Sequence, residues 1–596
     1  MRTTRGLAVV ATAATVAVGL AACGGGSTSS SSSSSSSSGS GSSAAGGATG
    51  FNAGEKSVVK PSDKKGGTLR MALSDDWDSL DPGDTYYAFA WDFARNYTRT
   101  LTTFKSTAGP EGSTMVPDLA ESLGKTTDGG KTWTYTLRKG LKYEDGTPIT
   151  SKDVKYAVAR ALDKDVLVNG PTYFGDFLDL QGYTSPFKLK DQAAGLKAIE
   201  TPDDTTIIFH LKKPFAGFDY MAAIPATAPV PPAKDNGTEY KKHVISSGPY
   251  MFKSNEAGKQ FTLVRNPNWD PATDPNRKAL PDEIDVKLKQ NQTDIDNQLL
   301  AGTLDVDIAG SGVGTQAQGR IIADPKLKAN SDNPIGARLW YISVNPDVAP
   351  LDKLECRQAV QYATDKVSVQ RAYGGATGGS IATNVMPPTI AGAQQFNLYP
   401  PGADNKGDLE KAKAALTACG QPNGFSTTMT FRADRPKEKA TAEAMQEALK
   451  RVGIQLTLKG FPAGDYFKLY AGKPDYAKAN NLGLATNGWG ADWPDGFGFI
   501  SQIVDSRTIR PSGGNYNLSV KDPAVDALLD KAVVTTDTTA RNQMYVDVDK
   551  KVMSDATILP TLWSKGLYYR PKTLTNVFYT PGYDMYDYAS LGTTRK

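Results

Sequence analysis

Apolar and polar residues alternate in one stretch near the start of the folded part of the chain. Trp133, Tyr135 and Leu137 are separated by single threonines. This period of two is typical of a β-strand with one face on a core. The preceding Asp128-Gly129-Gly130 supplies turn residues, so a hairpin arm entering a sheet is predicted.

The period then changes to that of a helix. Between residues 154 and 162, apolar side chains recur at i, i+3, i+4, i+7 and i+8. This spacing gives a helix one apolar face. Thr150, followed three residues later by Asp153, is a capping-box pattern that predicts the beginning of this helix. The stretch therefore reads as a strand-turn-helix unit of a mixed α and β protein.

Similar patterns recur through the second half of the chain. Helices are expected at residues 354–373, 408–419 and 442–452, and strands at residues 68–73, 339–345 and 454–458. Alternating helices and strands indicate an α/β sheet covered by helices.

The first residues have the pattern of a secretory signal. Arg2 and Arg5 precede a short apolar run that ends at Leu20, too short for a membrane-spanning helix. Leu20-Ala21-Ala22-Cys23 resembles the lipobox of bacterial lipoproteins, which implies cleavage before Cys23 and lipidation of that cysteine. An ordinary signal peptide with a chance cysteine is the alternative. Residues 24–50 are almost wholly Ser, Gly, Ala and Thr, which predicts a flexible tether.

Composition limits the classes of partner and chemistry. The 596 residues are 39% hydrophobic and 22% charged, and 67 basic against 63 acidic side chains give a net charge of +4. This balance argues against nucleic acid as a partner. The chain has only two histidines and neither a G-x-S-x-G nor an H-E-x-x-H motif. We therefore expect no enzyme, no metal site and no cofactor.

Two cysteines remain after Cys23. Cys356 and Cys419 form an even pair, which in an oxidising compartment is a disulfide candidate. Two separately buried thiols are the alternative.

Several fixed motifs carry a resemblance to a known family. The run from 117 to 162 contains PDLAES, an aromatic strand, LRKGLKY, DGTP and an Asp-Val helix; Leu80-Asp81-Pro82, Gly248-Pro249-Tyr250 and RNPNW at 265–269 accompany it. Together they resemble the solute-binding proteins of peptide-type ABC importers, bacterial family 5. The resemblance implies a periplasmic-binding-protein-like type II fold (cluster C), α/β, with two large lobes, a hinge, a small inserted subdomain and a ligand cleft between the lobes.

The resemblance also implies a division of the chain. The expected parts are a signal peptide (1–22), a lipid-anchored linker (23–65), lobe I in three pieces (66–103, 243–335 and 563–596), the inserted subdomain (104–242) and lobe II (336–562).

The stretch GWGADWPDGFGF at 488–499 is the most informative for binding. It resembles the family segment whose aspartate pairs with the α-amino group of a bound peptide, and the matching residue is Asp492. Asp495 is the alternative anchor. Trp489 and Trp493 would supply flat apolar walls.

Four more residues complete the candidate ligand site. Tyr86 and Tyr87 follow the Leu-Asp-Pro turn, at the mouth of the family's cleft, and could stack on a ligand. Asn345 ends the strand at 339–345. Arg435 is the candidate for holding a peptide carboxylate.

The function implied is capture of a solute outside the cytoplasm. We expect a monomeric lipoprotein on the outer face of the cell membrane that binds oligopeptides or dipeptides and delivers them to an ABC permease and its ATPase. An oligosaccharide is the alternative solute, because aromatic walls also suit sugars. A secreted hydrolase is the alternative from another class.

Overall fold

The structure is a computed structural model that describes residues 49–188, 192–402 and 404–595. The chain divides into residues 1–45 and a compact unit from Gly46 to Lys596. The signal peptide, Cys23 and most of the expected linker lie outside the described residues. Among the described residues, no helix is long and apolar enough to span a membrane.

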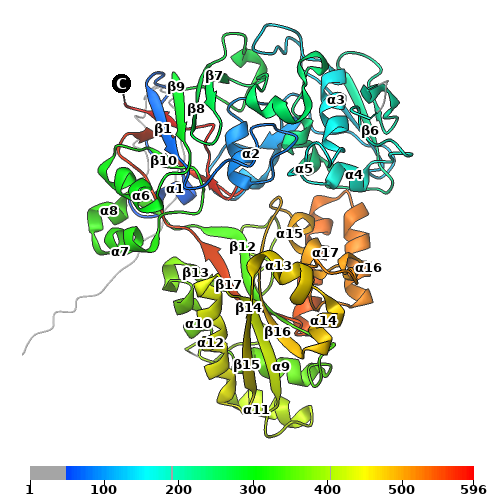
Figure 1. Ribbon diagram of the computed structural model, residues 1–596, viewed down its shortest axis with the longest axis vertical. Coiled ribbons are helices and arrows are strands. Elements are labelled where there is room, and N and C mark those ends of the chain that lie inside the picture. The colour runs from blue at the N-terminus through cyan, green and yellow to red at the C-terminus, as the bar shows by residue number, and fades with distance from the viewer. Residues whose placement is uncertain (1–48, 189–191, 403, 596) are drawn as a thin grey trace, which may run out of the picture. The chain divides into compact units, whose positions relative to one another are not determined.

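A five-stranded mixed sheet forms the centre of lobe I (Figure 1). Its order is β10 (Val306–Asp307), β1 (Thr68–Ala72), β9 (Glu283–Lys287), β8 (Gln260–Arg265) and β7 (Tyr250–Glu256). Strand β1 runs parallel to both of its neighbours, whereas β8 is antiparallel to β9 and β7. The helices of this lobe are α2 (Ala88–Ala94), α6 (Gln292–Ala301), α7 (Thr315–Ala323) and α8 (Pro325–Ala329).

The inserted subdomain contains the strand-turn-helix unit. Its three-stranded sheet has the order β4 (Thr132–Thr136), β6 (Thr206–His210) and β5 (Ile199–Glu200). Helices α3 (Ser151–Ala161), α4 (Tyr173–Phe177) and α5 (Phe218–Ala222) belong to the same part. The Asp153 carboxylate accepts hydrogen bonds from the Thr150 N–H and hydroxyl at 2.7 and 2.9 Å, so helix α3 begins where the sequence predicts.

Lobe II is built on a six-stranded sheet. Its order is β13 (Gly379–Ile381), β17 (Ile558–Lys565), β12 (Ile335–Val344), β16 (Leu482–Gly490), β14 (Ser426–Arg432) and β15 (Gln455–Phe461). Its main helices are α9 (Leu354–Ala363), α10 (Lys366–Ala372), α11 (Leu409–Ala418), α12 (Pro436–Lys450), α15 (Gly496–Val504), α16 (Pro523–Val534) and α17 (Thr538–Ser554).

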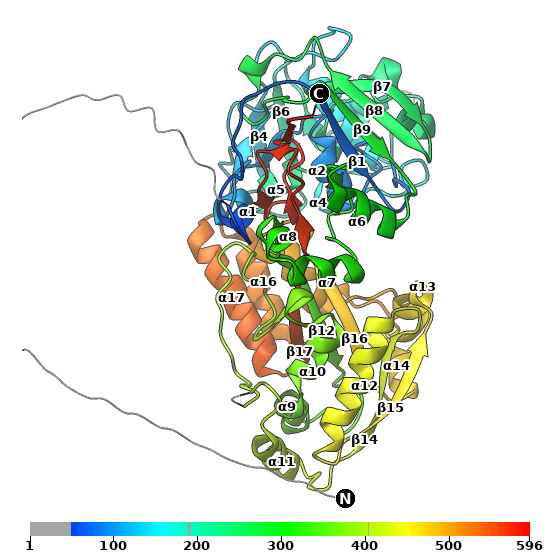
Figure 2. The ribbon, with the colours of Figure 1, turned by 90° about the vertical axis from the view of Figure 1, so that its left-hand side faces the viewer.

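Strand β12 shows why this sheet needs helices on both faces. Leu339 and Tyr341 join an apolar cluster with α15, α16 and α17, whereas Ile342 and Val344 join another with α9, α11 and α12. Side chains of a strand alternate between faces, so one central strand contributes to both cores. Figure 2 shows the two groups of helices at different sides of the sheet.

The single helix expected at 354–373 is two helices. Thr364 adopts an extended conformation with ψ 125°, which ends α9. The Asp365 carboxylate then accepts a hydrogen bond from the Ser368 N–H at 2.9 Å and caps α10. A local cap at the break thus offsets the cost of interrupting the helix.

The chain crosses between the lobes at two strands that pair with each other. β11 (Ser331–Asp332) is antiparallel to β18 (Tyr568–Tyr569). Residues 49–65, assigned from the sequence to the linker, contact this region. The Gly54 N–H donates to Asp332 Oδ1 at 2.9 Å, and Val59 pairs with Val577. The folded part of the chain therefore begins before Gly66. Helix α1 (Ala53–Lys56) and Val59 bury apolar surface, whereas the Ser- and Gly-rich stretch at 24–50 has little apolar surface to bury.

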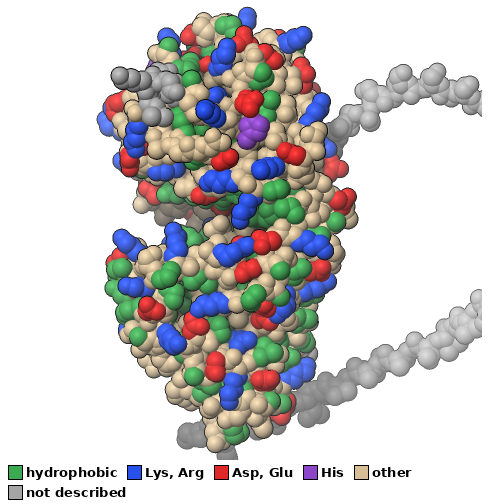
Figure 3. Space-filling view, turned by 90° about the vertical axis from the view of Figure 1, so that its right-hand side faces the viewer, with side chains coloured by type: hydrophobic (Ala, Val, Ile, Leu, Met, Phe, Trp, Pro, Cys, Tyr) green, Lys and Arg blue, Asp and Glu red, His purple; other side chains and the backbone are tan. Residues whose placement is uncertain are grey.

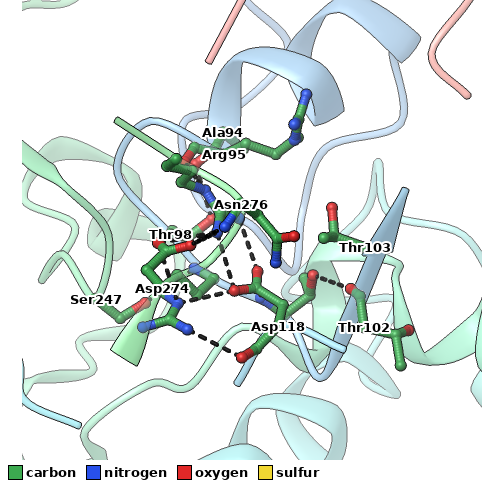
Figure 4. A network of polar contacts seen from close by, with 12 residues as sticks. Ala94, Arg95, Thr98, Thr102, Thr103, Asp118, Ser247, Asp274 and Asn276 are labelled. Carbon is green, nitrogen blue, oxygen red and sulfur yellow. Dashed lines mark hydrogen bonds and ion pairs between the residues drawn. The ribbon is translucent and has the colours of Figure 1, made fainter. Parts of the chain in front are cut away.

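The family motifs hold buried ion pairs. Asp118, of the PDLAES motif, accepts from Arg99 Nε at 2.8 Å and from Arg277 Nη2 at 2.7 Å; Figure 4 shows this network with Asp274 and Asn276 beside it. Burial alone would raise the pKa of Asp118, but the Arg277 and Arg99 guanidiniums outweigh it and hold that pKa at about 2. The network connects the segment around Asp118 to the segments that carry Arg99 and Arg277.

A second buried pair joins two motifs directly. Arg160 of α3 donates to both carboxylate oxygens of Asp81, in the Leu-Asp-Pro turn, at 2.7 and 2.8 Å, and it also donates to Asp235. These contacts give the motif residues a structural role.

Candidate functional site

The candidate site lies in the loop that connects β16 to α15. Strand β16 ends at Gly490 and helix α15 begins at Gly496. Asp495 caps this helix, because its Oδ1 accepts a hydrogen bond from the Gly498 N–H at 2.7 Å. Its side chain is buried, and burial raises its pKa to about 6. Asp495 therefore serves as the N-cap of α15.

Asp492 faces side chains from other parts of the chain. Its Oδ1 accepts a hydrogen bond from the Tyr86 hydroxyl at 3.1 Å, and its Oδ2 accepts one from the Tyr173 hydroxyl. Burial raises the pKa of Asp492 to about 6, although the two tyrosines and the charge of Arg338 oppose the rise. A carboxylate with neutral partners can accept a cation without first breaking an ion pair.

Asp492 lines a cavity of about 110 Å³. The walls come from α2, the inserted subdomain, the first residues of β12, the 490–494 loop and the 581–584 turn. Space-filling atoms show a notch in the surface between the two lobes (Figure 3). Well-formed ligand sites are typically ~300–1,000 Å³, so this cavity has room for one end of a ligand.

The aromatic candidates divide between open and packed positions. Tyr86 and Tyr87 are 43% and 53% exposed. Trp489 is partly exposed, with its ring centroid 5.1 Å from that of Tyr516. Trp493 is buried against Tyr173, with ring centroids 4.9 Å apart, and it also lines the cavity. Tyr86, Tyr87 and Trp489 thus keep exposed ring surface but do not line the 110 Å³ cavity, whereas Trp493 lines it and is buried.

The structure does not bring Asn345 to this cavity. Its Oδ1 accepts a hydrogen bond from the Asp347 N–H at 3.0 Å, and its side chain is buried. Arg338, at the cavity end of β12, is seven residues away, about 23 Å at the usual rise of a strand. Asn345 shapes the turn that follows the strand.

Arg435 keeps a largely free guanidinium. It lies at the N-cap position of α12, its side chain is 48% exposed, and its Nη1 is 3.6 Å from Glu438. Glu438 is already paired with Arg432. Arg435 does not line the 110 Å³ cavity. Its positive charge nevertheless contributes to lowering the pKa of Arg338, which does line the cavity.

Two residues near Asp492 were not expected from the sequence: Arg338 lines the cavity, and Tyr173 donates to Asp492 without lining it. Tyr173 comes from the short helix α4, about 320 residues before Asp492, and no local pattern marks such a pairing. Arg338 had a signal, because an arginine inside the central strand of a sheet is unusual.

Cys356 and Cys419 form a disulfide in this structure, with the sulfurs 2.06 Å apart. The bond joins α9 to the end of α11, away from the cavity residues. Among the described residues, no group of three or more His, Cys, Asp or Glu side chains has the geometry to hold a metal ion.

Comparison with known proteins gives one consistent family. A sequence model described as bacterial extracellular solute-binding proteins, family 5 Middle, matches residues 114–510. The "Probable D,D-dipeptide-binding periplasmic protein DdpA" of Escherichia coli (strain K12) is 29% identical over 526 residues, covering 85% of this chain and 90% of the relative. Heme-binding protein A of Haemophilus influenzae is 29% identical over 478 residues, 76% of this chain and 80% of that protein.

Solved structures agree on the fold. The structure titled clavulanic acid biosynthesis oligopeptide binding protein 2 has a TM-score of 0.87 and 42% identity, covering 91% of this chain and 98% of that chain. DppA from Helicobacter pylori in complex with peptide STSA has a TM-score of 0.64 at 22% identity, covering 89% of this chain and 99% of that chain.

Proposed function

Because the chain belongs to the bacterial extracellular solute-binding proteins of family 5, we propose that it captures short peptides with a free amino terminus. It is a solute-binding protein of an ABC importer, which implies a permease and an ATPase as partners. One observation carries the peptide assignment. Asp492 presents a carboxylate to the cavity, and its hydrogen-bonding partners among the described residues are two tyrosine hydroxyls.

The chemistry of the site favours an ammonium group. A peptide amine taken out of water needs an anion and hydrogen-bond acceptors, and a charge-assisted hydrogen bond contributes roughly 1.5–3 kcal/mol. Asp492 offers that anion, and the hydroxyls of Tyr86 and Tyr173 fix its orientation. Arg435, exposed on the same lobe, is proposed to hold the carboxylate at the other end of the peptide.

An oligosaccharide remains the second candidate because of the aromatic surface. Trp489 and Tyr516 lie with ring centroids 5.1 Å apart, and Tyr516 is 44% exposed. Exposed aromatic rings of this kind suit the apolar face of a sugar. Identification of the compounds that copurify with the protein separates the two classes.

The finer placement in the cell envelope is part of the same proposal. Cleavage before Cys23 and lipidation of that residue would tether a monomer to the outer face of the cell membrane through the serine-rich stretch. The parts expected at 104–242 and 336–562 are proposed to move relative to the rest of the chain. Each contains its own sheet, β4–β6–β5 in the first and the six-stranded sheet in the second.

The test replaces Asp492 by Asn and compares free with acetylated peptides by isothermal titration calorimetry. We expect wild-type protein to bind Ala-Ala-Ala at least about tenfold more tightly than its N-acetyl form, since one charge-assisted bond is lost. In D492N this preference should disappear. Glu410→Gln, which removes an 89% exposed charge on α11, is the control and should bind like wild type. Equal losses for both peptides in D492N would refute the amine anchor.

A further inference from the structure

We propose that Arg338 forms an anion subsite beside the amine anchor, so that the preferred peptides carry an acidic side chain close to their amino terminus. This inference rests on the proposed function and names the substrate class more narrowly. Arg338 and Asp492 line the same cavity. Arg338 therefore lies beside the end of the ligand that Asp492 is proposed to hold.

The backbone around Arg338 leaves room for its side chain. Arg338 on β12 pairs with Gly490 on β16. A Cβ atom at Gly490 would lie 2.9 Å from Arg338 Nη2, too close for an unshifted guanidinium. The glycine thus lets the arginine lie against the edge of the loop that carries Asp492.

An aromatic ring supports the same guanidinium. The Arg338 Cζ lies 5.6 Å from the centroid of the Trp340 ring, two residues along the same face of β12. Stacking on tryptophan orients a planar guanidinium while leaving its N–H donors free. The subsite is therefore built from a fixed cation, a ring and a glycine.

The guanidinium of Arg338 has no ion-pair or hydrogen-bond partner in the part of the chain that the structure describes. Arg338 is an exposed position of β12, and the cavity that it lines takes part of its side chain out of water. Burial lowers the pKa of Arg338, and the neighbouring charges of Arg432 and Arg435 add to that effect, whereas Asp584 and Tyr373 oppose it. An anion in the cavity would offset this cost.

The two nearby carboxylates do not supply that anion. Asp492 is the proposed amine anchor. Asp584 accepts hydrogen bonds from the Tyr579 hydroxyl and from the Ala337 N–H, the latter at 3.0 Å. On the arginine side, Glu438 is paired with Arg432. The guanidinium of Arg338 is left to a carboxylate brought by the ligand, which it can bind through two parallel N–H donors.

The test measures binding of four peptides to the full-length protein and to three variants by calorimetry. The peptides are Asp-Ala-Ala, Asn-Ala-Ala, Ala-Asp-Ala and Ala-Asn-Ala, so each acid has an amide of the same shape. Wild type should bind at least one acid about tenfold more tightly than its amide. Arg338→Gln should reduce that ratio to below about twofold, whereas Arg338→Lys should retain part of it. Glu410→Gln serves as the control.

The measured acid-to-amide ratios decide whether Arg338 forms an anion subsite. A wild-type protein without acid preference, or an R338Q protein that keeps it, overturns the inference. If R338Q fails to fold, as judged by its thermal midpoint, the wild-type ratios and their fall with added salt decide instead. If N-acetylation abolishes binding but acids and amides bind equally, the anion subsite is refuted and the amine anchor stands. Absence of binding to every peptide would overturn the proposed function with it.

Discussion

Asp492 and Asp495 come from one loop, yet their carboxylates have different partners. Asp495 accepts the backbone N–H of Gly498 and caps a helix, whereas Asp492 accepts two tyrosine hydroxyls and lines the cavity. The pKa of each is raised to about 6 by burial. Of the two carboxylates, Asp492 is the one that lines the cavity and is placed to bind a ligand.

Peptide affinity should depend on pH through Asp492. An ammonium ligand prefers the ionised carboxylate, so binding lowers the pKa of Asp492 from about 6. Affinity is then full above this value and falls as pH decreases through it, by about tenfold between pH 7 and pH 5. Calorimetry of Ala-Ala-Ala at these two values tests this.

Two variants identify the group responsible for that pH dependence. Tyr173→Phe removes a hydrogen bond that lowers the pKa of Asp492, so the loss of affinity should begin at a higher pH. The peptide affinity of D492N should not fall between pH 7 and pH 5, although Asp495 is unchanged. An acid loss that persists in D492N would assign the titration to another group.

At the scale of elements, the buried ion network is expected to hold the segment around Asp118 in place. Asp118→Asn leaves the guanidiniums of Arg99 and Arg277 buried with less negative charge. Removing one partner of a buried pair costs roughly 3–5 kcal/mol in the free energy of unfolding. Urea denaturation at pH 7 measures it. Asp204→Asn, in an exposed pair with Lys152, is the control and should cost under about 1 kcal/mol.

The sign of the pH dependence gives a second check on this network. The folded pKa of Asp118, about 2, is below its ordinary value of 3.8, so its stabilisation is present above pH 4 and is lost as pH falls toward 2. The stability gap between wild type and D118N should therefore narrow across this range. A constant gap would show that the cost comes from packing.

Local patterns predicted elements well and long-range pairings poorly. The helix at α3 and the strand at β4 follow from periodicity and a capping box, because both depend on neighbours in sequence. The break between α9 and α10 does not follow from the sequence pattern. Asp365 is polar like many residues inside helices, and only the folded backbone shows that it caps α10. Asp492 was found through a family motif, whereas Tyr173 and Arg338 join it only by folding.

At the scale of the whole chain, the site is shared among three parts. In the division of the chain expected from the sequence, Asp492 belongs to lobe II, Tyr86 to lobe I and Tyr173 to the inserted subdomain, and both tyrosines donate to Asp492. A ligand that contacts all of them binds best when they are together, and so shifts the population toward the closed form. We expect the hinge for that motion at the paired strands β11 and β18.

The most direct test of the central claim is native mass spectrometry of the chain from residue 49 onward, purified from cells grown in rich medium. The compounds released in acid are then identified. We predict a set of short peptides with free amino termini, absent from the D492N protein prepared in parallel. A ladder of hexose increments, or peptides retained equally by D492N, would contradict the account.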